Sequence, residues 1–263
     1  ISDDTEGFLG IGMGAPSVNE QNQTITYAAN LNWDGSLDII QALSQAFSVP
    51  VKLTNDANLL VLAHQHYDDT LLSDFFVVTL GTGVGAGICC NGRLLKGKEG
   101  FAGELGHVIV NERGRACSCG RQGCLECYVS ANGIIRTVIS LIAEFNSYKG
   151  SLLDIPMADL NAKMITELAL SGDEIAKRAL TLTGQMLGQA LANMVALFNP
   201  QRIYLAGGVT HADELLLAPT CQFFHQHLLN VYPDKITIEK SKFDDHEGAI
   251  LGASVLIWQL KEG

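Results

Sequence analysis

The sequence predicts an α/β fold, because short apolar runs typical of strands alternate with longer segments of helical periodicity. Residues 8–18 (FLGIGMGAPSV) and 74–88 (DFFVVTLGTGVGAGI) are apolar and interrupted by glycine, as buried strands and their turns are. In residues 37–47, apolar side chains recur every three or four positions, which places them on one face of a helix. A hydrophobic content of 47% in 263 residues is enough for one large domain or two modest ones.

The first part of the chain alternates strands with helices. We expect a strand over 8–13, a glycine–proline turn over 14–18, a helix over 37–47, a strand over 49–53 and a helix over 57–66. The pair Asn55-Asp56 stands between the last two elements. The carboxyl end of a strand is where ligands of α/β sheets usually bind. Asn and Asp are also common N-caps, and the dipeptide by itself favours the capping interpretation.

A glycine-rich turn lies inside residues 74–88. Gly81, Thr82, Gly83 and Gly85 give a backbone that can come close to an anion, with a hydroxyl from Thr82. A single Gly-x-Gly turn is weak evidence, and an ordinary β-hairpin explains the same residues. The turn lacks the Gly-Lys-Ser/Thr of a P-loop. Asn91-Gly92 then predicts a second hairpin turn.

The second half of the chain is predicted to be mainly helical. Helices are expected over 129–145, 165–170 and 173–198, and Asn199-Pro200 ends the last of them. The run RIYLAGGVT (202–210) predicts a strand that leads into a glycine turn, and EGAILGASVLIWQL (247–260) predicts a helix rich in small residues. Gly207 and Gly208 in that turn either pack against an adenine ring or only reverse the chain.

The segment Gly103–Glu126 (GELGHVIVNERGRACSCGRQGCLE) predicts a metal site. Three cysteines, Cys117, Cys119 and Cys124, lie within eight residues, and His107 precedes them. Three thiolates and one imidazole are the ligand set of a closed, tetrahedral structural zinc site. The alternative is three reduced cysteines in a surface loop. We favour zinc, because free cysteines are usually buried and rarely gather on a glycine-rich hairpin.

Composition and charge narrow the class of protein. The net charge is −11, the pI is near 5.0, and no cluster of Lys and Arg stands out. These values argue against a nucleic-acid-binding surface on this chain. Seven cysteines, three of them in the metal-like cluster, fit a reducing compartment better than a disulfide framework. We therefore expect a cytoplasmic protein with no membrane segment.

Two motifs resemble the signature of the ROK family, which contains sugar kinases and sugar-responsive repressors. They are GELGH followed by CSCGRQGCLE, and the block beginning Asn55-Asp56-Ala57-Asn58. The resemblance implies an actin-like ATPase (ribonuclease H-like) architecture of two lobes. Residues 1–72 and 247–263 would form the remainder of the small lobe, and 73–246 the large lobe with the zinc loop. The Asp-x-Gly-Gly-Thr phosphate loop of ROK kinases does not occur here, so we expect the first strands of the small lobe to be missing.

The resemblance also assigns roles to residues. Asp56 would be the base that takes the proton from the sugar hydroxyl, and His107 would both hold sugar and ligate zinc with Cys117, Cys119 and Cys124. The sugar would be held by Asn30, Asn55, Asp56, Glu104, His107 and Glu126, and the nucleotide by Gly81, Thr82, Gly83, Gly207 and Gly208.

The activity implied is ATP-dependent phosphorylation of a hexose or N-acetylhexosamine, with Mg²⁺ accompanying the nucleotide and Zn²⁺ shaping the loop. The rival interpretation is a sugar-sensing ROK repressor whose DNA-binding N-terminus lies outside this chain. A third is a sugar-binding remnant without catalysis. Without the phosphate loop, we expect these 263 residues alone to be inactive or weakly active. Relatives suggest a homodimer or homotetramer.

Overall fold

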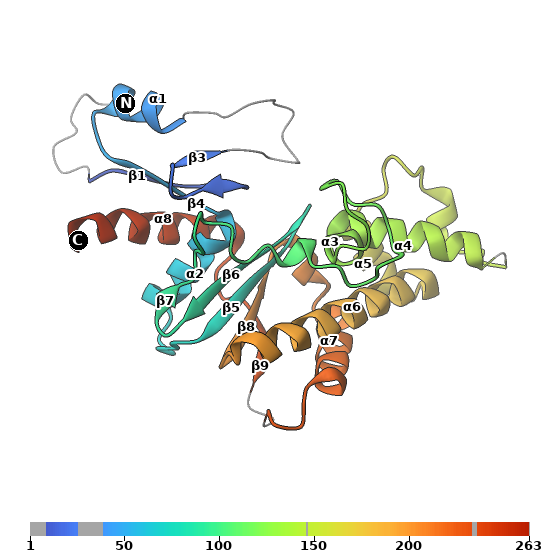
Figure 1. Cartoon of the computed structure of the whole chain (residues 1–263). Helices are drawn as coiled ribbons and strands as arrows, with labels where there is room; N and C mark the ends of the chain where they lie inside the picture. The colour runs from blue at the N-terminus through green and yellow to red at the C-terminus, as the bar shows by residue number, and fades with distance from the viewer. Residues whose placement is uncertain (1–8, 26–38, 146, 233–235, 263) are drawn as a thin grey trace. The chain divides into compact units, whose positions relative to one another are not determined.

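The computed structural model describes residues 9–25, 39–145, 147–232 and 236–262 (Figure 1). The chain divides into two compact units. Unit 1 comprises Ile1–Val77, Ala86–Gly103 and Ser241–Gly263, and unit 2 comprises Val78–Gly85 and Glu104–Lys240. The predicted sugar residue Asn30 lies outside the described part of the chain.

Strands and helices alternate along the chain, as the sequence predicts. In unit 1 they are β1 (Ile11–Gly14), β2 (Val18–Asn19), β3 (Thr24–Ile25), α1 (Ile39–Phe47), β4 (Val51–Thr54), α2 (Asp56–Tyr67), β7 (Arg93–Leu94) and α8 (Asp245–Glu262). In unit 2 they are η1 (Leu105–His107), α3 (Glu126–Val129), α4 (Ala131–Glu144), η2 (Ser151–Asp154), α5 (Ala162–Leu170), α6 (Glu174–Phe198), β8 (Arg202–Ala206), η3 (Gly208–Ala212), α7 (Glu214–His227) and β9 (Thr237–Lys240). The strands β5 (Phe75–Leu80) and β6 (Val84–Cys90) contribute residues to both units.

Three sheets organise the strands. β1 pairs with β4 in parallel, so that Ile11 stands opposite Val51, and β2 pairs with β3 antiparallel. The third sheet has five strands in the order β7-β6-β5-β8-β9. Its outer pairs are β6–β7, antiparallel around the predicted Asn91-Gly92 turn, and β8–β9, parallel. Both turn residues have positive φ angles, 51° and 69°, as a tight hairpin turn requires.

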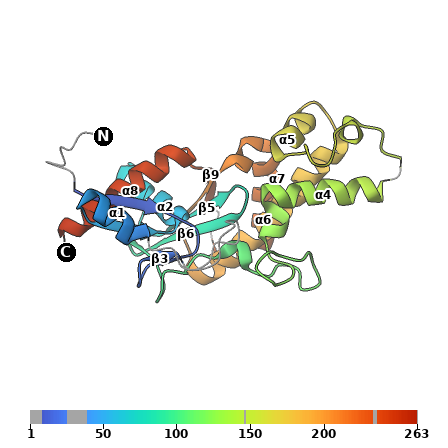
Figure 2. The same ribbon diagram turned by 90° about the horizontal axis from the view of Figure 1, so that it is seen from above.

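Close backbone packing holds α8 in unit 1. Helix α8 lies beside α2 (Figure 2), and the two share an apolar cluster of Leu59, Leu62, Val255 and Leu256. A Cβ atom at Gly252 would stand 2.0 Å from the carbonyl oxygen of Leu59, so only glycine permits this approach. The small residues of the predicted C-terminal helix are therefore packing positions.

In unit 2, α6 and α7 pack together by the same means. A Cβ atom at Gly188 of α6 would stand 2.4 Å from the carbonyl oxygen of Thr220 in α7. Asn199 ends α6 in the left-handed conformation, with φ of 46°, which fits the predicted stop at Asn199-Pro200. The sequence did not predict α7 and β9. Pro219 lies inside α7, and an internal proline normally argues against a helix.

No helix among the described residues combines the length and the apolar character needed to span a bilayer.

The α2–α8 contact gives a stability prediction. Gly252→Ala should lower the free energy of unfolding by about 1–3 kcal/mol, because the added methyl group forces the helix away from the backbone of α2. The measurement is chemical denaturation followed by circular dichroism. Ile250→Ala on the same helix is the control, because Ile250 is 71% exposed and should change stability little. An unchanged midpoint for Gly252→Ala would contradict the packing described.

Candidate functional site

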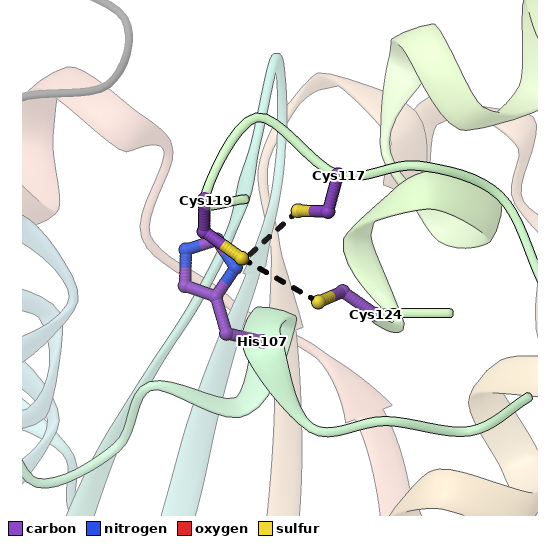
Figure 3. A group of neighbouring side chains, drawn as sticks. All are labelled: His107, Cys117, Cys119 and Cys124. Carbon is purple, nitrogen blue, oxygen red and sulfur yellow. Dashed lines mark hydrogen bonds between the residues drawn. The ribbon is translucent and has the colours of Figure 1, made fainter. Parts of the chain in front are cut away.

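Four side chains of the cysteine-rich segment meet at one point in unit 2. The ligand atoms of His107, Cys117, Cys119 and Cys124 all lie within 4.8 Å of one another. Figure 3 shows His107 projecting from η1 toward the three sulfur atoms. The Sγ of Cys117 lies 3.7 Å from Nδ1 of His107, and the Sγ atoms of Cys119 and Cys124 are also 3.7 Å apart.

These distances fit a tetrahedral metal ion. Thiolates at about 2.3 Å from a central zinc ion stand about 3.8 Å from each other at the corners of a tetrahedron. The group could therefore hold a metal ion with all four positions filled by protein. Because Nδ1 of His107 faces the thiols, the Nε2 atom is left for another partner.

Backbone pairing brings the ligands together. Residues around Ile109 and Cys124 form one antiparallel bridge, and Ala116 and Gln122 form a second. Gly123 turns with φ of 76°, and a Cβ atom there would stand 1.6 Å from the carbonyl oxygen of Asn111. Glycine is thus required at position 123, because the chain passes close to the backbone of Asn111 just before Cys124 joins the cluster.

The thiols differ in how easily they ionise. Burial raises the pKa of Cys124 to about 12, and its hydrogen bond with Cys119 adds to the effect. Burial also opposes ionisation at Cys119, but hydrogen bonds from Arg121 and from the neighbouring thiols outweigh it and lower the pKa of Cys119 to about 6. Of these two thiols, Cys119 is therefore the one that ionises more readily.

The two predicted carboxylates of this segment occupy different surroundings. Glu104 is exposed, and its carbonyl oxygen accepts a 3.1 Å hydrogen bond from the His107 amide. Glu126 is half-buried as the first residue of α3, and its Oε2 atom accepts a 2.9 Å hydrogen bond from the Val84 amide. Glu126 thus contacts the end of the predicted glycine turn.

The glycine turn borders a cavity of about 580 Å³ in unit 2. Gly81 and Thr82 line one side of it, and Gly208 of η3 lines another. Gly207 packs instead against β5, where a Cβ atom would stand 2.5 Å from the carbonyl oxygen of Leu80. The structure therefore brings three of the predicted nucleotide residues to one cavity. Its volume is in the range of small-molecule sites.

Asn55 and Asp56 lie in unit 1, where β4 passes into α2. The Oδ1 atom of Asn55 caps the helix by accepting a 2.9 Å hydrogen bond from the Ala57 amide, and Asp56 is the first helical residue. The Asp56 side chain is exposed, yet the surrounding protein reduces the hydration of its carboxylate and so raises its pKa above the ordinary 3.8. The negative charge of Asp245 raises the pKa further.

Several residues at these places were not predicted from the sequence. The cavity is also lined by Asn161 and Lys163 at the start of α5 and by His211 of η3. In unit 1, Glu20 is buried beside the Asp56 region: it accepts hydrogen bonds from Thr54 and Asn58 and pairs with Lys96 at 2.9 Å. These residues come from distant elements and form no local motif, so only the fold brings them together.

Comparison with known proteins identifies the family. The profile of the ROK family matches residues 1–260. The chain belongs to the ROK family. It is 33% identical over 258 residues to the glucokinase of Halalkalibacterium halodurans. The alignment covers 97% of this chain and 77% of that enzyme. It is 32% identical over 227 residues to the DNA-binding transcriptional dual regulator NagC of Escherichia coli, covering 86% of this chain and 53% of the regulator.

The solved structures agree with this assignment. A crystal structure of a ROK family glucokinase from Streptomyces griseus in complex with glucose and AMPPNP aligns with a TM-score of 0.83 at 29% identity, covering 94% of this chain and 81% of the enzyme. The predicted α/β fold of the actin-like ROK kinases is thereby confirmed. ROK kinases and ROK repressors are both relatives, and the chain spans little more than half the length of the repressor.

The metal cluster gives a prediction. Purified protein should contain about one metal ion per chain, and Cys117→Ser should bind it less tightly and unfold at a lower temperature, because one of the four protein ligands is removed. Elemental analysis and thermal unfolding measure the two effects. Cys221→Ser is the matched control, since Cys221 lies in α7 outside the cluster. Equal metal content in the two variants would refute the ligand assignment.

Proposed function

We propose that this protein is a ROK sugar kinase that transfers the γ-phosphoryl group of ATP to a hydroxyl of a hexose or N-acetylhexosamine. The observation that carries the proposal is the Asp56 carboxylate, which stands at the first turn of α2 with a raised pKa. A carboxylate whose pKa is shifted toward neutrality is a better general base than an ordinary surface aspartate. The similarity to glucokinases over most of the chain supports the same conclusion.

In this proposal Asp56 accepts the proton of the sugar hydroxyl as its oxygen attacks the γ-phosphorus atom. Phosphoryl transfer requires alignment and charge neutralisation more than covalent chemistry. Asn55 can orient the sugar through its Nδ2 group, because capping uses only Oδ1. Glu104, Glu126 and Nε2 of His107 would accept or donate hydrogen bonds to the remaining hydroxyls, together with Asn30.

We propose Zn²⁺ as the ion of the cysteine cluster, because three thiolates and one imidazole suit it. The ion supplies structural closure of the loop and no open position for chemistry. Its consequence for the site is the orientation of His107: once Nδ1 is engaged, the ring is fixed and Nε2 is directed away from the cluster.

The cavity in unit 2 is the proposed nucleotide site. The turn residues Thr82 and Gly83 would offer amide groups to the phosphates, and Gly208 would lie against the adenosine part, where a Cβ atom would meet nothing within 4 Å. Mg²⁺ would enter with ATP and neutralise phosphate charge. The amino-terminal ends of α4 and α5 border the same cavity and favour an anion there.

A sugar-responsive repressor is the second candidate. The 32% identity to NagC favours it, because a repressor of this family would share the fold and the metal cluster. The net charge of −11 argues against DNA binding by this chain, so in this candidate DNA binding would belong to a further domain. The two candidates differ in turnover, which only the kinase would show.

The kinase proposal is tested by Asp56→Asn. When this substitution is made in the full-length protein, sugar-dependent ADP release should fall by about 10²–10⁴-fold, because the asparagine amide cannot accept the hydroxyl proton. The assay uses a panel of hexoses and N-acetylhexosamines. Asp69→Asn, an exposed aspartate just beyond α2, is the matched control. Thermal stabilisation by a sugar without any turnover in the unaltered protein would overturn the kinase in favour of the sensor.

The raised pKa of Asp56 gives a pH prediction. A general base works only when deprotonated, so kcat/KM should fall as the pH drops through the pKa of Asp56, and the midpoint should lie above 3.8. The pH profile of kcat/KM measures this, with circular dichroism at each pH as the control for unfolding. A rate that stays constant down to pH 3.8 in folded enzyme would show that Asp56 is not the base.

A further inference from the structure

The turn Gly81–Val84, called the phosphate turn below, is fastened at both ends to one neighbouring segment. The amide of Ala131 donates a 2.9 Å hydrogen bond to the carbonyl oxygen of Gly81. At the other end, the amide of Val84 donates a 2.9 Å hydrogen bond to Oε2 of Glu126. The two partners lie five residues apart, at the start of α3 and the start of α4.

The turn is also braced internally. The amide of Gly81 donates to the carbonyl oxygen of Gly83 at 3.0 Å, and the amide of Gly85 donates to the hydroxyl of Thr79 at 3.2 Å. With the amides of Gly81, Val84 and Gly85 engaged, those of Thr82 and Gly83 are the ones that the turn can present to a phosphate. The hydrogen bonds at Gly81 and Val84 set the direction in which these two amides point.

We propose that Glu126 is a positioning residue for the nucleotide: its carboxylate holds the Val84 amide and thereby aims the phosphate turn. This inference rests on the proposed kinase function, and it adds a role to the sugar contact that the family resemblance implies. Of the two contacts at the ends of the turn, the one with Val84 is made by a side chain, Glu126, whereas the Ala131 bond is made by backbone on both sides.

The role depends on the hydrogen bond and not on the charge. A carboxylate is a strong acceptor, but its negative charge beside the phosphate turn opposes an anionic ligand. Glutamine keeps an acceptor oxygen at the same reach and removes the charge. Positioning through Val84 therefore predicts that Glu126→Gln retains nucleotide affinity, whereas Glu126→Ala loses it.

The metal loop sets where this carboxylate stands. Glu126 follows Cys124 by two residues, and the intervening Leu125 amide donates a 2.9 Å hydrogen bond to the carbonyl oxygen of Val108, next to His107. Closing the four-ligand cluster thus fixes the start of α3. Because Glu126 contacts Val84, metal removal should also disturb the phosphate turn.

The test measures binding of Mg·ADP without sugar by isothermal titration calorimetry. Relative to the unaltered protein, the dissociation constant should rise about tenfold for Glu126→Ala, consistent with loss of the hydrogen bond that holds the turn, and stay within about threefold for Glu126→Gln. Glu144→Ala is the charge-matched control, an exposed residue at the end of α4. Hydrogen exchange at the Val84 amide should accelerate only in Glu126→Ala.

Two failures can be told apart. If the unaltered protein does not bind Mg·ADP at all, the proposed kinase function falls, and this inference falls with it. If it binds, but Glu126→Ala binds equally well or Val84 exchange is unchanged, only the positioning role is overturned. A loss that is the same for Glu126→Gln and Glu126→Ala would also overturn it, because charge and not the hydrogen bond would then be decisive.

Discussion

The convergence of four ligand atoms at the cysteine cluster is the constraint on which the site depends. The loop between η1 and α3 has little apolar material to hold it: Val108 and Ile109 are about half exposed, and buried residues appear only from Gly123 onward. Two isolated bridges pair the two sides of the loop, and the Arg115 side chain, near its middle, donates to the carbonyl oxygens of Cys127 and Gly133. A bound ion would supply the cross-link that a hydrophobic core supplies elsewhere.

The metal ligands are close in sequence to the residues proposed to bind the substrate and nucleotide. His107 lies in η1 and Cys124 lies two residues before Glu126, so the cluster fixes an imidazole and a carboxylate in one step. The contact from Glu126 to Val84 then passes the constraint to the β5–β6 turn. In the proposed site, the loop would in this way influence the phosphate turn without any contact between its metal and the ligand.

The sequence was sufficient wherever the signal is local. The cluster was predictable because its ligands lie within one segment, and α6 because its apolar periodicity persists to the Asn199 stop. Helix α7 was missed because Pro219 interrupts the pattern, although its ring packs against Gly184 of α6. The cavity residues Lys163 and His211 were missed for a different reason: they come from separate elements, and no spacing along the chain records that they share a surface.

Asn55-Asp56 shows why the local interpretation and the functional one need not compete. Capping requires an oxygen at Asn55, and the next residue then necessarily opens the helix, with its carboxylate near the positive end of the α2 dipole. That dipole and the Ala57 amide favour the charged form of Asp56, while desolvation and Asp245 oppose it and prevail. The capping geometry therefore fixes the carboxylate in place, and the surroundings set its basicity. A dipeptide chosen for helix initiation becomes a candidate base through the protein packed around it.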